Sequence, residues 1–452
     1  MSPELRQIDP RTVTIGTNVR SLPELDAPDF VASVRELGVL TPITVNETAA
    51  AGYQLRYGQR RILAAIAAER ETIPALVLPA GDDTDEAKAA RLVEQWAENE
   101  HRAAITENDR VNAVEQLALL GVPAGQIATR LHVKRSAVTA ARKVASNVEA
   151  QAAMIEHDLT IEDAAILAEF SDDAHAMDEL RSTLSYGRSL THTAQRLRDE
   201  RREAKALAKL RTETEAQGIK VVEHDELTRL VSLVTAERED ITDEAHAACP
   251  GHAAYVSTST SWETGRAVRT PRVVYGCTDP EAHGHQHRYP QANHSTADRG
   301  IGPDGKMTEE AKDERRKVIA NNKAYESALT VRTEWIAAFA KSSGPIKGAE
   351  VFIARALIAG EFRPAYSRAE AESLGKKLTD RSQPATALRA AVAVLLDQWS
   401  RDHQHRNGWR EPGAQTIRFL TAMQGWGYEL ADVEREMLHP EQPAPGEASD
   451  TE

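Results

Sequence analysis

A glycine followed by two arginines lies at a junction between a predicted strand, residues 53–57, and a predicted helix, residues 61–69. Four residues join or begin these elements: Gly58, Gln59, Arg60 and Arg61. A helix N-terminus presents backbone N–H groups to an anion, and guanidinium groups form charge-assisted hydrogen bonds with phosphate. The junction is therefore a candidate anion site. Taken alone, the same four residues also describe a turn with surface arginines.

A stretch without any Asp or Glu, residues 121–148, occurs in a chain whose formal net charge is −14. Apolar spacing predicts a short helix before His132 and a second helix over 134–144, which together form a helix-turn-helix pattern. The turn position of His132 is usually glycine in such motifs. The second helix would enter the major groove of DNA. The candidate DNA-binding residues are Gln126, Lys134, Arg135, Ser136, Thr139, Arg142 and Lys143. The alternative is a helical hairpin with a solvated basic face.

The two cysteines of the chain stand close to histidines, in the spacings Cys-x2-His and Cys-x5-His. Residues 255–256 and 272–275 read as strands, so each cysteine would lie at a strand end. Two thiolates and two imidazoles suit tetrahedral Zn²⁺, and a metal would help a segment with little apolar content to fold. The expected ligands are Cys249, His252, Cys277 and His283, and the fourth ligand remains open among His283, His285 and His287. The alternative is two reduced cysteines beside a His-rich surface loop.

The elements that must position these residues alternate between strand and helix only near the start of the chain. Short strands are expected at 13–15, 43–45, 53–57 and 75–78, with helices at 28–37 and 61–69. This alternation favours a small α/β domain. Later apolar spacing is helical, notably at 148–169, 308–336, 346–359, 385–399 and 414–423. The remainder of the chain is therefore expected to be mostly α.

Together these segments resemble the ParB family of chromosome and plasmid partition proteins. Residues 38–45 look like the nucleotide-base segment of the family, and residues 58–64 look like its GERRxRA box. Glu98-Asn99-Glu100-His101-Arg102 matches its ENxxR box, and the helix-turn-helix pattern follows at the family's distance. The resemblance covers residues 5–200 and suggests a plasmid- or phage-type member. It implies a CTP-dependent sliding clamp that is loaded at a DNA site.

The resemblance also implies roles for individual residues. Arg60 and Arg61 would neutralise a triphosphate, and Glu98 with Asn99 would hold Mg²⁺ through oxygen ligands. The implied nucleotide-binding residues are Thr41, Pro42, Gly58, Gln59, Arg60, Arg61, Glu98, Asn99 and Arg102. Gln59 departs from the family, which has Glu there, and Leu63 stands where Arg is frequent. Because a Gln side chain cannot act as a general base, we expect a weak CTPase or none.

The expected architecture is multidomain and predominantly α. Its parts are a ParB-like α/β nucleotide-binding domain (1–100), an all-α helix-turn-helix domain (101–200), a charged helical connector (201–244), a zinc-binding module (245–290), an all-α C-terminal domain (306–438) and a disordered acidic tail (439–452). Residues 288–305 read as a linker.

Three functions follow from these observations. The first is a partition protein that binds DNA at a centromere-like site. It would act as a homodimer, be regulated by CTP and have a ParA-type ATPase as a partner. The second is a plasmid or phage transcriptional repressor without nucleotide switching. The third, a sulfiredoxin-related phosphoryl-transfer enzyme, needs a reactive cysteine in the N-terminal domain, which has none. No early apolar run resembles a signal peptide or a membrane span, so a cytoplasmic, DNA-associated protein is expected.

Overall fold

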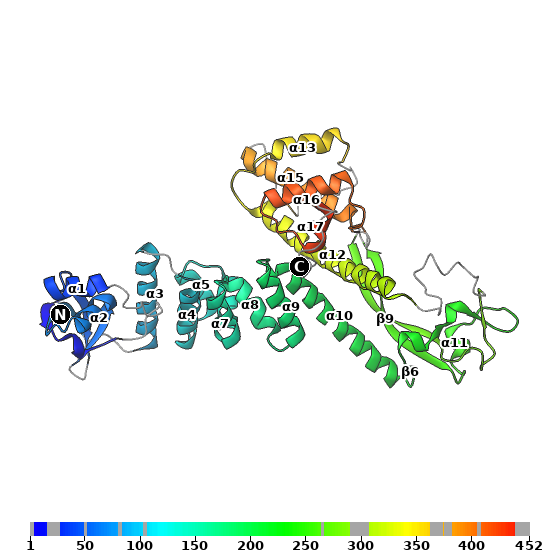
Figure 1. The fold of residues 1–452 in the computed structure, drawn as a ribbon, viewed down its shortest axis with the longest axis horizontal. Helices are drawn as coiled ribbons and strands as arrows, with labels where there is room; N and C mark the ends of the chain where they lie inside the picture. Colours follow the sequence, from blue (N-terminus) through cyan, green and yellow to red (C-terminus); the bar gives the residue numbers. More distant parts are fainter. Residues whose placement is uncertain are drawn as a thin grey trace, which may run out of the picture. The chain divides into compact units, whose positions relative to one another are not determined.

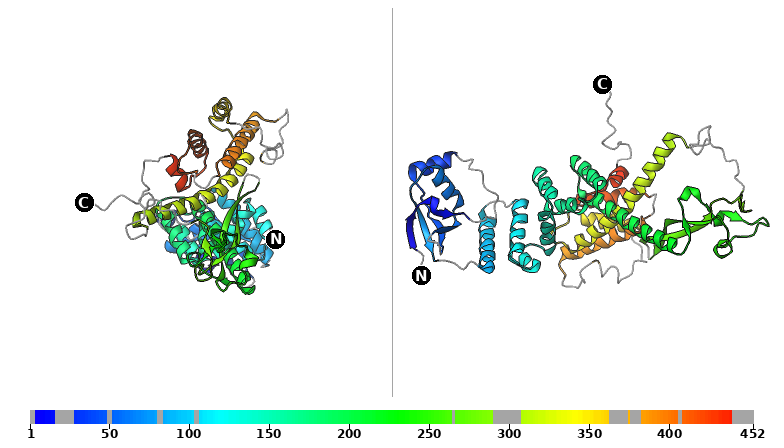
Figure 2. Two further views of the ribbon diagram at one scale, coloured as in Figure 1. Left: turned by 90° about the vertical axis from the view of Figure 1, so that its right-hand side faces the viewer. Right: turned by 90° about the horizontal axis from the view of Figure 1, so that it is seen from below.

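The computed structural model falls into two compact units, residues Met1–Ser182 and Thr183–Glu452 (Figures 1 and 2). The residues that it describes are 4–15, 28–48, 52–79, 84–102, 106–263, 266–289, 307–361, 374, 382–404 and 408–438. The description covers the backbone but not the side chains of 98–102, 260–263 and 266–268. Most of the expected linker, from residue 290 onwards, and the tail from residue 439 lie outside the described residues.

The first unit begins with a small α/β domain. Its sheet has the order β1 (Glu4–Ile8), β5 (Ile73–Leu78), β3 (Ile43–Glu47), β4 (Tyr53–Tyr57) and β2 (Val13–Thr14). Strand β3 is parallel to β5 and antiparallel to β4. Two helices accompany the sheet, α1 (Pro28–Leu37) and α2 (Gln59–Ala67). The α/β domain predicted from the alternation of strands and helices is thereby confirmed.

Alternation of apolar residues builds the core of this domain. Ile73, Ala75 and Val77 of β5 are buried, while their neighbours along the strand are partly exposed. They meet Ile43 of β3 and Ile62 of α2, both fully buried, in one apolar cluster. A strand with period-two burial and a helix with one apolar face can cover each other in this way. The core fixes the end of β4 and the start of α2, where the candidate anion site lies.

The remainder of the first unit is helical. The helices are α3 (Asp85–Arg102), α4 (Glu107–Leu119), α5 (Ala124–Arg130), α6 (Arg135–Ala145), α7 (Val148–Glu156), α8 (Ile161–Phe170) and α9 (Ala174–Ser185), the last of which ends in the second unit. Helix α6 contacts α4, α5 and α8 and buries Val138, Ala141 and Val144. Helix α4 begins with a capping box between Thr106 and Asp109, which satisfies backbone N–H groups at its first turn.

The second unit begins with the long helix α10 (Leu190–Ala216), which packs against a β-ribbon. The ribbon consists of antiparallel strands β9 (His252–Glu263) and β10 (Arg266–Cys277), in a sheet with the order β6-β9-β10-β7. The flanking strands are β6 (Lys220–Val221) and β7 (Thr228–Arg229), and a separate pair joins β8 (Leu233–Val234) to β11 (Gln286–His287). The one-turn helix α11 (Asp243–His246) precedes β9 (Figure 1).

A helical core completes the second unit. Its helices are α12 (Glu309–Lys341), α13 (Ala349–Ile358), α15 (Pro384–Asp402), α16 (Ala414–Gly425) and α17 (Asp432–Leu438). Large side chains fill it, among them Tyr325, Phe339, Trp399 and Phe419. The described parts of 308–438 are helices and their connections, and the predicted bounds of an all-α domain at 306–438 stay a prediction. Among the described residues, no helix is both long enough and apolar enough to span a membrane.

Candidate nucleotide- and DNA-binding sites

The junction between β4 and α2 depends on a glycine. Gly58 has φ = 106°, in the left-handed region, and it is the residue that precedes the first turn of α2. A Cβ atom at this position would lie 2.8 Å from Cγ2 of Ile43, a fully buried core residue. Both the backbone conformation and the close packing therefore require glycine. At the start of α2, Arg60 is exposed, while Gly58, Gln59 and Arg61 are partly buried.

The two arginines that follow Gly58 lie in different surroundings. Arg61 donates hydrogen bonds from Nη1 to the backbone carbonyls of Thr41 and Pro42, at 2.9 and 2.5 Å. Arg60 is exposed, and its guanidinium carbon lies 5.5 Å from the ring centroid of Phe30. Sequence reasoning assigned both arginines to phosphate. In the structure Arg61 joins the segment at Thr41 and Pro42 to the start of α2, and a role toward phosphate stays a prediction for both arginines.

The segment Glu98-Asn99-Glu100-His101-Arg102 occupies the C-terminal end of α3. The side chains of Glu98, Asn99 and Arg102 lie outside the described residues, so their expected roles stay predictions. One turn earlier in the same helix, Glu94 accepts a hydrogen bond from Arg56 of β4 at 2.9 Å. The helix that carries the ENxxR-like segment is thus joined to the strand that leads into Gly58.

A cavity of about 340 Å³ lies where β3 and β4 meet α3 and α4. Asn46, 8% exposed, lines it, and its Oδ1 is buried without a hydrogen-bond partner among the described residues. Three basic side chains also line the cavity: Arg56, Lys88 and Arg91. Sequence reasoning missed this cavity, although Lys88 and Arg91 are three positions apart and therefore share one face of α3.

Four residues, 131–134, join α5 to α6, whereas the sequence predicted a shorter turn at His132 and Val133. His132 in this turn has φ = 53°, so it occupies the left-handed conformation that glycine usually supplies. Six of the seven candidate DNA-binding side chains are exposed: Gln126, Lys134, Arg135, Ser136, Thr139 and Arg142. The seventh differs. Lys143 is partly buried and pairs with Glu169 of α8 at 3.2 Å, so it is turned toward the helical body.

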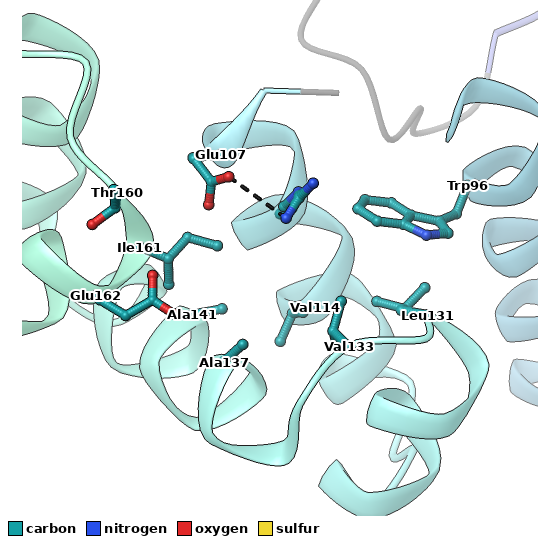
Figure 3. A pocket seen from close by; sticks show the side chains of 11 residues that line it. Trp96, Glu107, Val114, Leu131, Val133, Ala137, Ala141, Thr160, Ile161 and Glu162 are labelled. Carbon is teal, nitrogen blue, oxygen red and sulfur yellow. Dashed lines mark ion pairs between the residues drawn. The ribbon is translucent and has the colours of Figure 1, made fainter. Parts of the chain in front are cut away.

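A cavity of about 140 Å³ lies behind α6 (Figure 3). Trp96 of α3, Val114 of α4, Leu131 of the turn, Ala141 of α6 and Ile161 of α8 all contribute to its lining. Trp96 is 2% exposed. Figure 3 shows these side chains converging from the surrounding helices, with the Glu107–Arg110 ion pair at 3.6 Å among the lining residues. The helix with the ENxxR-like segment thus shares this cavity with α6, and α4 contacts both helices.

The cysteine–histidine cluster of the second unit differs from the expected ligand set. One potential ligand atom from each of His246, Cys249, Cys277 and His285 lies within 4.8 Å of the others. The expected cysteines are in this group, and so is His285, one of the three histidines left open for the fourth position, but His252 and His283 are not. His252 Nδ1 lies 3.0 Å from His246 Nδ1, and the ring of His283 packs against Gly251.

Burial changes the chemistry of two members of this cluster. Desolvation, with the neighbouring histidines, lowers the pKa of His246 to about 4, so its imidazole is neutral near pH 7. Burial raises the pKa of the Cys277 thiol to about 11. A neutral imidazole is the form that binds metals, whereas a thiol must lose its proton.

Comparison with known proteins places the first part of the chain. Residues 4–95 match the ParB N-terminal domain family. C-terminally truncated ParB from Caulobacter crescentus complexed with CTP-γ-S is 25% identical over 39% of this chain and 98% of that chain, with a TM-score of 0.19. The same protein complexed to the centromeric parS site is 20% identical over 42% and 96%, with a TM-score of 0.30.

A Pnob8-like ParB-N domain is 14% identical over 40% of this chain and 85% of that chain, with a TM-score of 0.28. The family match over residues 4–95 covers the α/β domain at the start of the first unit. The chain is ParB-like through its N-terminal region, where residues 4–95 form a ParB N-terminal domain.

Proposed function

We propose that this chain is a partition-type protein that binds a specific DNA duplex and changes its DNA-bound state with CTP. The observation that carries the proposal is the order of two features in one compact unit. A ParB N-terminal domain is followed by a helix, α6, that exposes an acid-free basic face. A basic face of this kind supplies phosphate contacts, while individual side chains on it read bases.

In this proposal α5, its turn and α6 form a helix-turn-helix. Lys134, Arg135 and Ser136 stand at the N-terminal end of α6, the end that reaches base edges when a recognition helix enters the major groove. Thr139 follows one turn later on the exposed face. Val138, Ala141 and Val144 form the opposite, buried face of the same helix. Lys143 supports this arrangement through Glu169 and contributes less to DNA recognition.

The nucleotide side of the proposal depends on the junction at Gly58. Its left-handed backbone and the N-terminus of α2 offer N–H groups to a phosphate, and Arg60 supplies an exposed positive charge. Arg61 positions the segment at Thr41 and Pro42, which the family resemblance assigns to the nucleotide. Glu98 and Asn99 would hold Mg²⁺, and Arg102 would contact phosphate, on the same resemblance. Gln59 in place of Glu supports slow hydrolysis or none.

Helix α3 connects the two sides. It carries the ENxxR-like segment at its C-terminal end and Trp96 on the wall of the cavity behind α6. A small displacement of α3 on nucleotide binding would therefore be felt at Leu131 and Ala141, which line the same cavity. Packed helices shift between discrete arrangements, and α4, which contacts both α3 and α6, is the route that this coupling would take.

A second function has a specific observation in its favour. Arg61 is already engaged by two carbonyls, and Gln59 lacks the carboxylate of the family. Both facts favour a repressor that binds its operator without a nucleotide switch. In either case we expect a homodimer on duplex DNA, and a ParA-type ATPase is the additional partner of the partition function. The helical C-terminal region is the candidate for dimerisation or partner binding.

One experiment separates these functions. The full chain first selects a duplex from a random DNA pool, and its dissociation from that duplex is then timed with Mg²⁺ and CTP, GTP, ATP or no nucleotide. The partition proposal expects a change with CTP alone. An operator complex with a lifetime that no nucleotide alters would identify the repressor. Failure to enrich any sequence would contradict both functions.

A further inference from the structure

We propose that the second unit holds one structural Zn²⁺ ion through His246, Cys249, Cys277 and His285. Two thiolates and two imidazoles make a closed tetrahedral set, with no position left for a substrate water. Hard cations such as Mg²⁺ and Ca²⁺ prefer oxygen ligands, so this donor set selects against them. In this set His246 takes the place of His252, and His285, one of the three histidines that the sequence left open for the fourth position, takes the place of His283.

The separation of the donor atoms fits a zinc ion. Sγ of Cys249 lies 3.6 Å from Nε2 of His285, and the four ligand atoms lie within 4.8 Å of one another. Zn–S and Zn–N bonds of about 2.3 and 2.0–2.1 Å at a tetrahedral angle place sulfur and nitrogen about 3.6 Å apart. Cys277 is fully buried and His246 is 1% exposed, while Cys249 and His285 are partly buried.

Local hydrogen bonds position the four ligands in two pairs. His246 ends the one-turn helix α11, and its carbonyl accepts a hydrogen bond from the N–H of Cys249 at 2.9 Å. Cys277 ends β10, and His285 follows a turn in which its N–H donates to the carbonyl of Pro280 at 2.8 Å. One pair thus comes from the turn before the ribbon and the other from the end of the ribbon.

His252 acts on the site through His246. Its Nδ1 lies 3.0 Å from Nδ1 of His246, and its ring stacks on Tyr275 with the centroids 5.6 Å apart. Nε2 of His246 is buried and has no hydrogen-bond partner among the described residues. A proton on Nδ1 of His246, donated to His252, leaves the Nε2 lone pair for the metal. A hydrogen bond of this kind orients a metal-bound imidazole, so His252 is a positioning residue.

Gly251 is required by the same site. A Cβ atom at this position would lie 2.7 Å from Sγ of Cys277 and 2.5 Å from Cδ2 of His283. Any larger residue would push the sulfur away from its partners. The ring of His283 lies beside Gly251 as well, but His283 is not among the four residues whose ligand atoms converge.

The small apolar core around the site gives the metal a structural role. The cluster of buried hydrophobic residues next to it contains Leu230, Leu233 and Cys277. Zn²⁺ binding displaces one proton from each thiol to solvent, which leaves a complex of two thiolates, two neutral imidazoles and one dication with no net charge. The binding free energy then becomes folding free energy of this module.

The test begins with the full chain purified in reductant without chelator. Elemental analysis is expected to find one zinc per chain, and Co²⁺ exchanged into the protein should give the absorption of a tetrahedral site with thiolate-to-cobalt charge transfer. Zinc content near zero in protein that is fully folded by circular dichroism would overturn the proposal. A Cys249–Cys277 disulfide in reductant-purified protein, detected by mass spectrometry after alkylation, would overturn it as well.

Variants identify the ligands. His246→Ala and His285→Ala should lose stoichiometric zinc, whereas His283→Ala and the matched control His287→Ala should retain it. His252→Ala should weaken zinc binding about 10–100-fold in competition with a chelator, and His252→Asn should restore part of that loss. If a ligand variant fails to fold, the cobalt spectrum of the wild type still decides the donor set. Zinc retained in His246→Ala or His285→Ala would contradict the assignment.

Discussion

Two basic side chains near opposite ends of α6 have different surroundings. Arg135 is exposed in the first turn, whereas Lys143 is half-buried and pairs with Glu169. Arg135→Ala should weaken binding to the selected duplex by about 1–3 kcal/mol if the side chain reads a base. Lys143→Ala should have a smaller effect, because its charge is shared with Glu169. Fluorescence anisotropy at fixed salt measures both, and equal losses in the two variants would contradict this assignment.

The neighbouring arginines Arg60 and Arg61 provide a second matched pair. Arg61→Ala removes hydrogen bonds to the carbonyls of Thr41 and Pro42, and it should lower the free energy of unfolding by about 1–3 kcal/mol. Arg60→Ala should leave stability within about 0.5 kcal/mol. It should weaken CTP binding, because an exposed charge-assisted phosphate contact is lost.

Urea denaturation and calorimetry with CTP and Mg²⁺ separate the two effects. Normal CTP affinity in Arg60→Ala would show that this residue does not belong to the nucleotide site.

Restoring the carboxylate at position 59 tests hydrolysis at the same site. Gln59→Glu should raise CTP turnover if position 59 limits it. Rapid turnover in the wild type, unchanged in Gln59→Glu, would show that hydrolysis does not depend on this position.

One residue in the turn between α5 and α6, His132, has a strained backbone conformation. His132 has φ = 53° and its side chain is exposed, so little packing would be lost on shortening it. A non-glycine residue in this conformation costs about 1–2 kcal/mol, and the greater flexibility of glycine offsets about 0.5–1 kcal/mol of the gain. His132→Gly should therefore raise the thermal midpoint of the first unit modestly. A lower midpoint would mean that the histidine makes a compensating contact.

Elements with a clear apolar period were predictable from the sequence. Helical spacing predicts the helices around 28–37 and 124–145, and short β-branched or apolar runs predict four of the five strands of the N-terminal sheet; the structure has these elements there. Strand β1 was missed because only Ile8 of its five residues is buried, so the edge strand has no alternating pattern. The ribbon was recognised only in part, since its Ser- and Thr-rich middle lacks apolar residues.

Side-chain partners across long sequence separations were less predictable. The fold of Arg61 back onto Thr41 and Pro42 depends on how β3 and α2 pack, which no local spacing encodes. The metal ligands show the same limit. The cysteines were found from their spacing, but the choice of histidines depends on the one-turn helix that ends at His246 and on the turn before His285.

At the scale of the whole molecule, a buried ion pair joins α12 to α17 in the second unit. Arg332 and Glu434 are both 0% exposed, and the Glu434 carboxylate also accepts hydrogen bonds from the Tyr428 hydroxyl and the N–H of Ala431. Burial, with the charge of Glu434, raises the pKa of Tyr428 well above its usual value, so the phenol stays a donor. Removing one charge would leave the other buried without its partner.

Glu434→Gln should therefore destabilise the second unit by about 3–5 kcal/mol. The first unit has its own apolar core, so differential scanning calorimetry of the full chain should show two transitions, of which the variant lowers only one. The control is Asp313→Asn, which disrupts the exposed pair of Asp313 with Arg316 and should change stability by about 1 kcal/mol at most. Because the exposed face of α6 lies in the first unit, DNA binding should be lost on heating with the transition that the variant leaves unchanged. A single transition that moves as a whole would show that the two units unfold cooperatively.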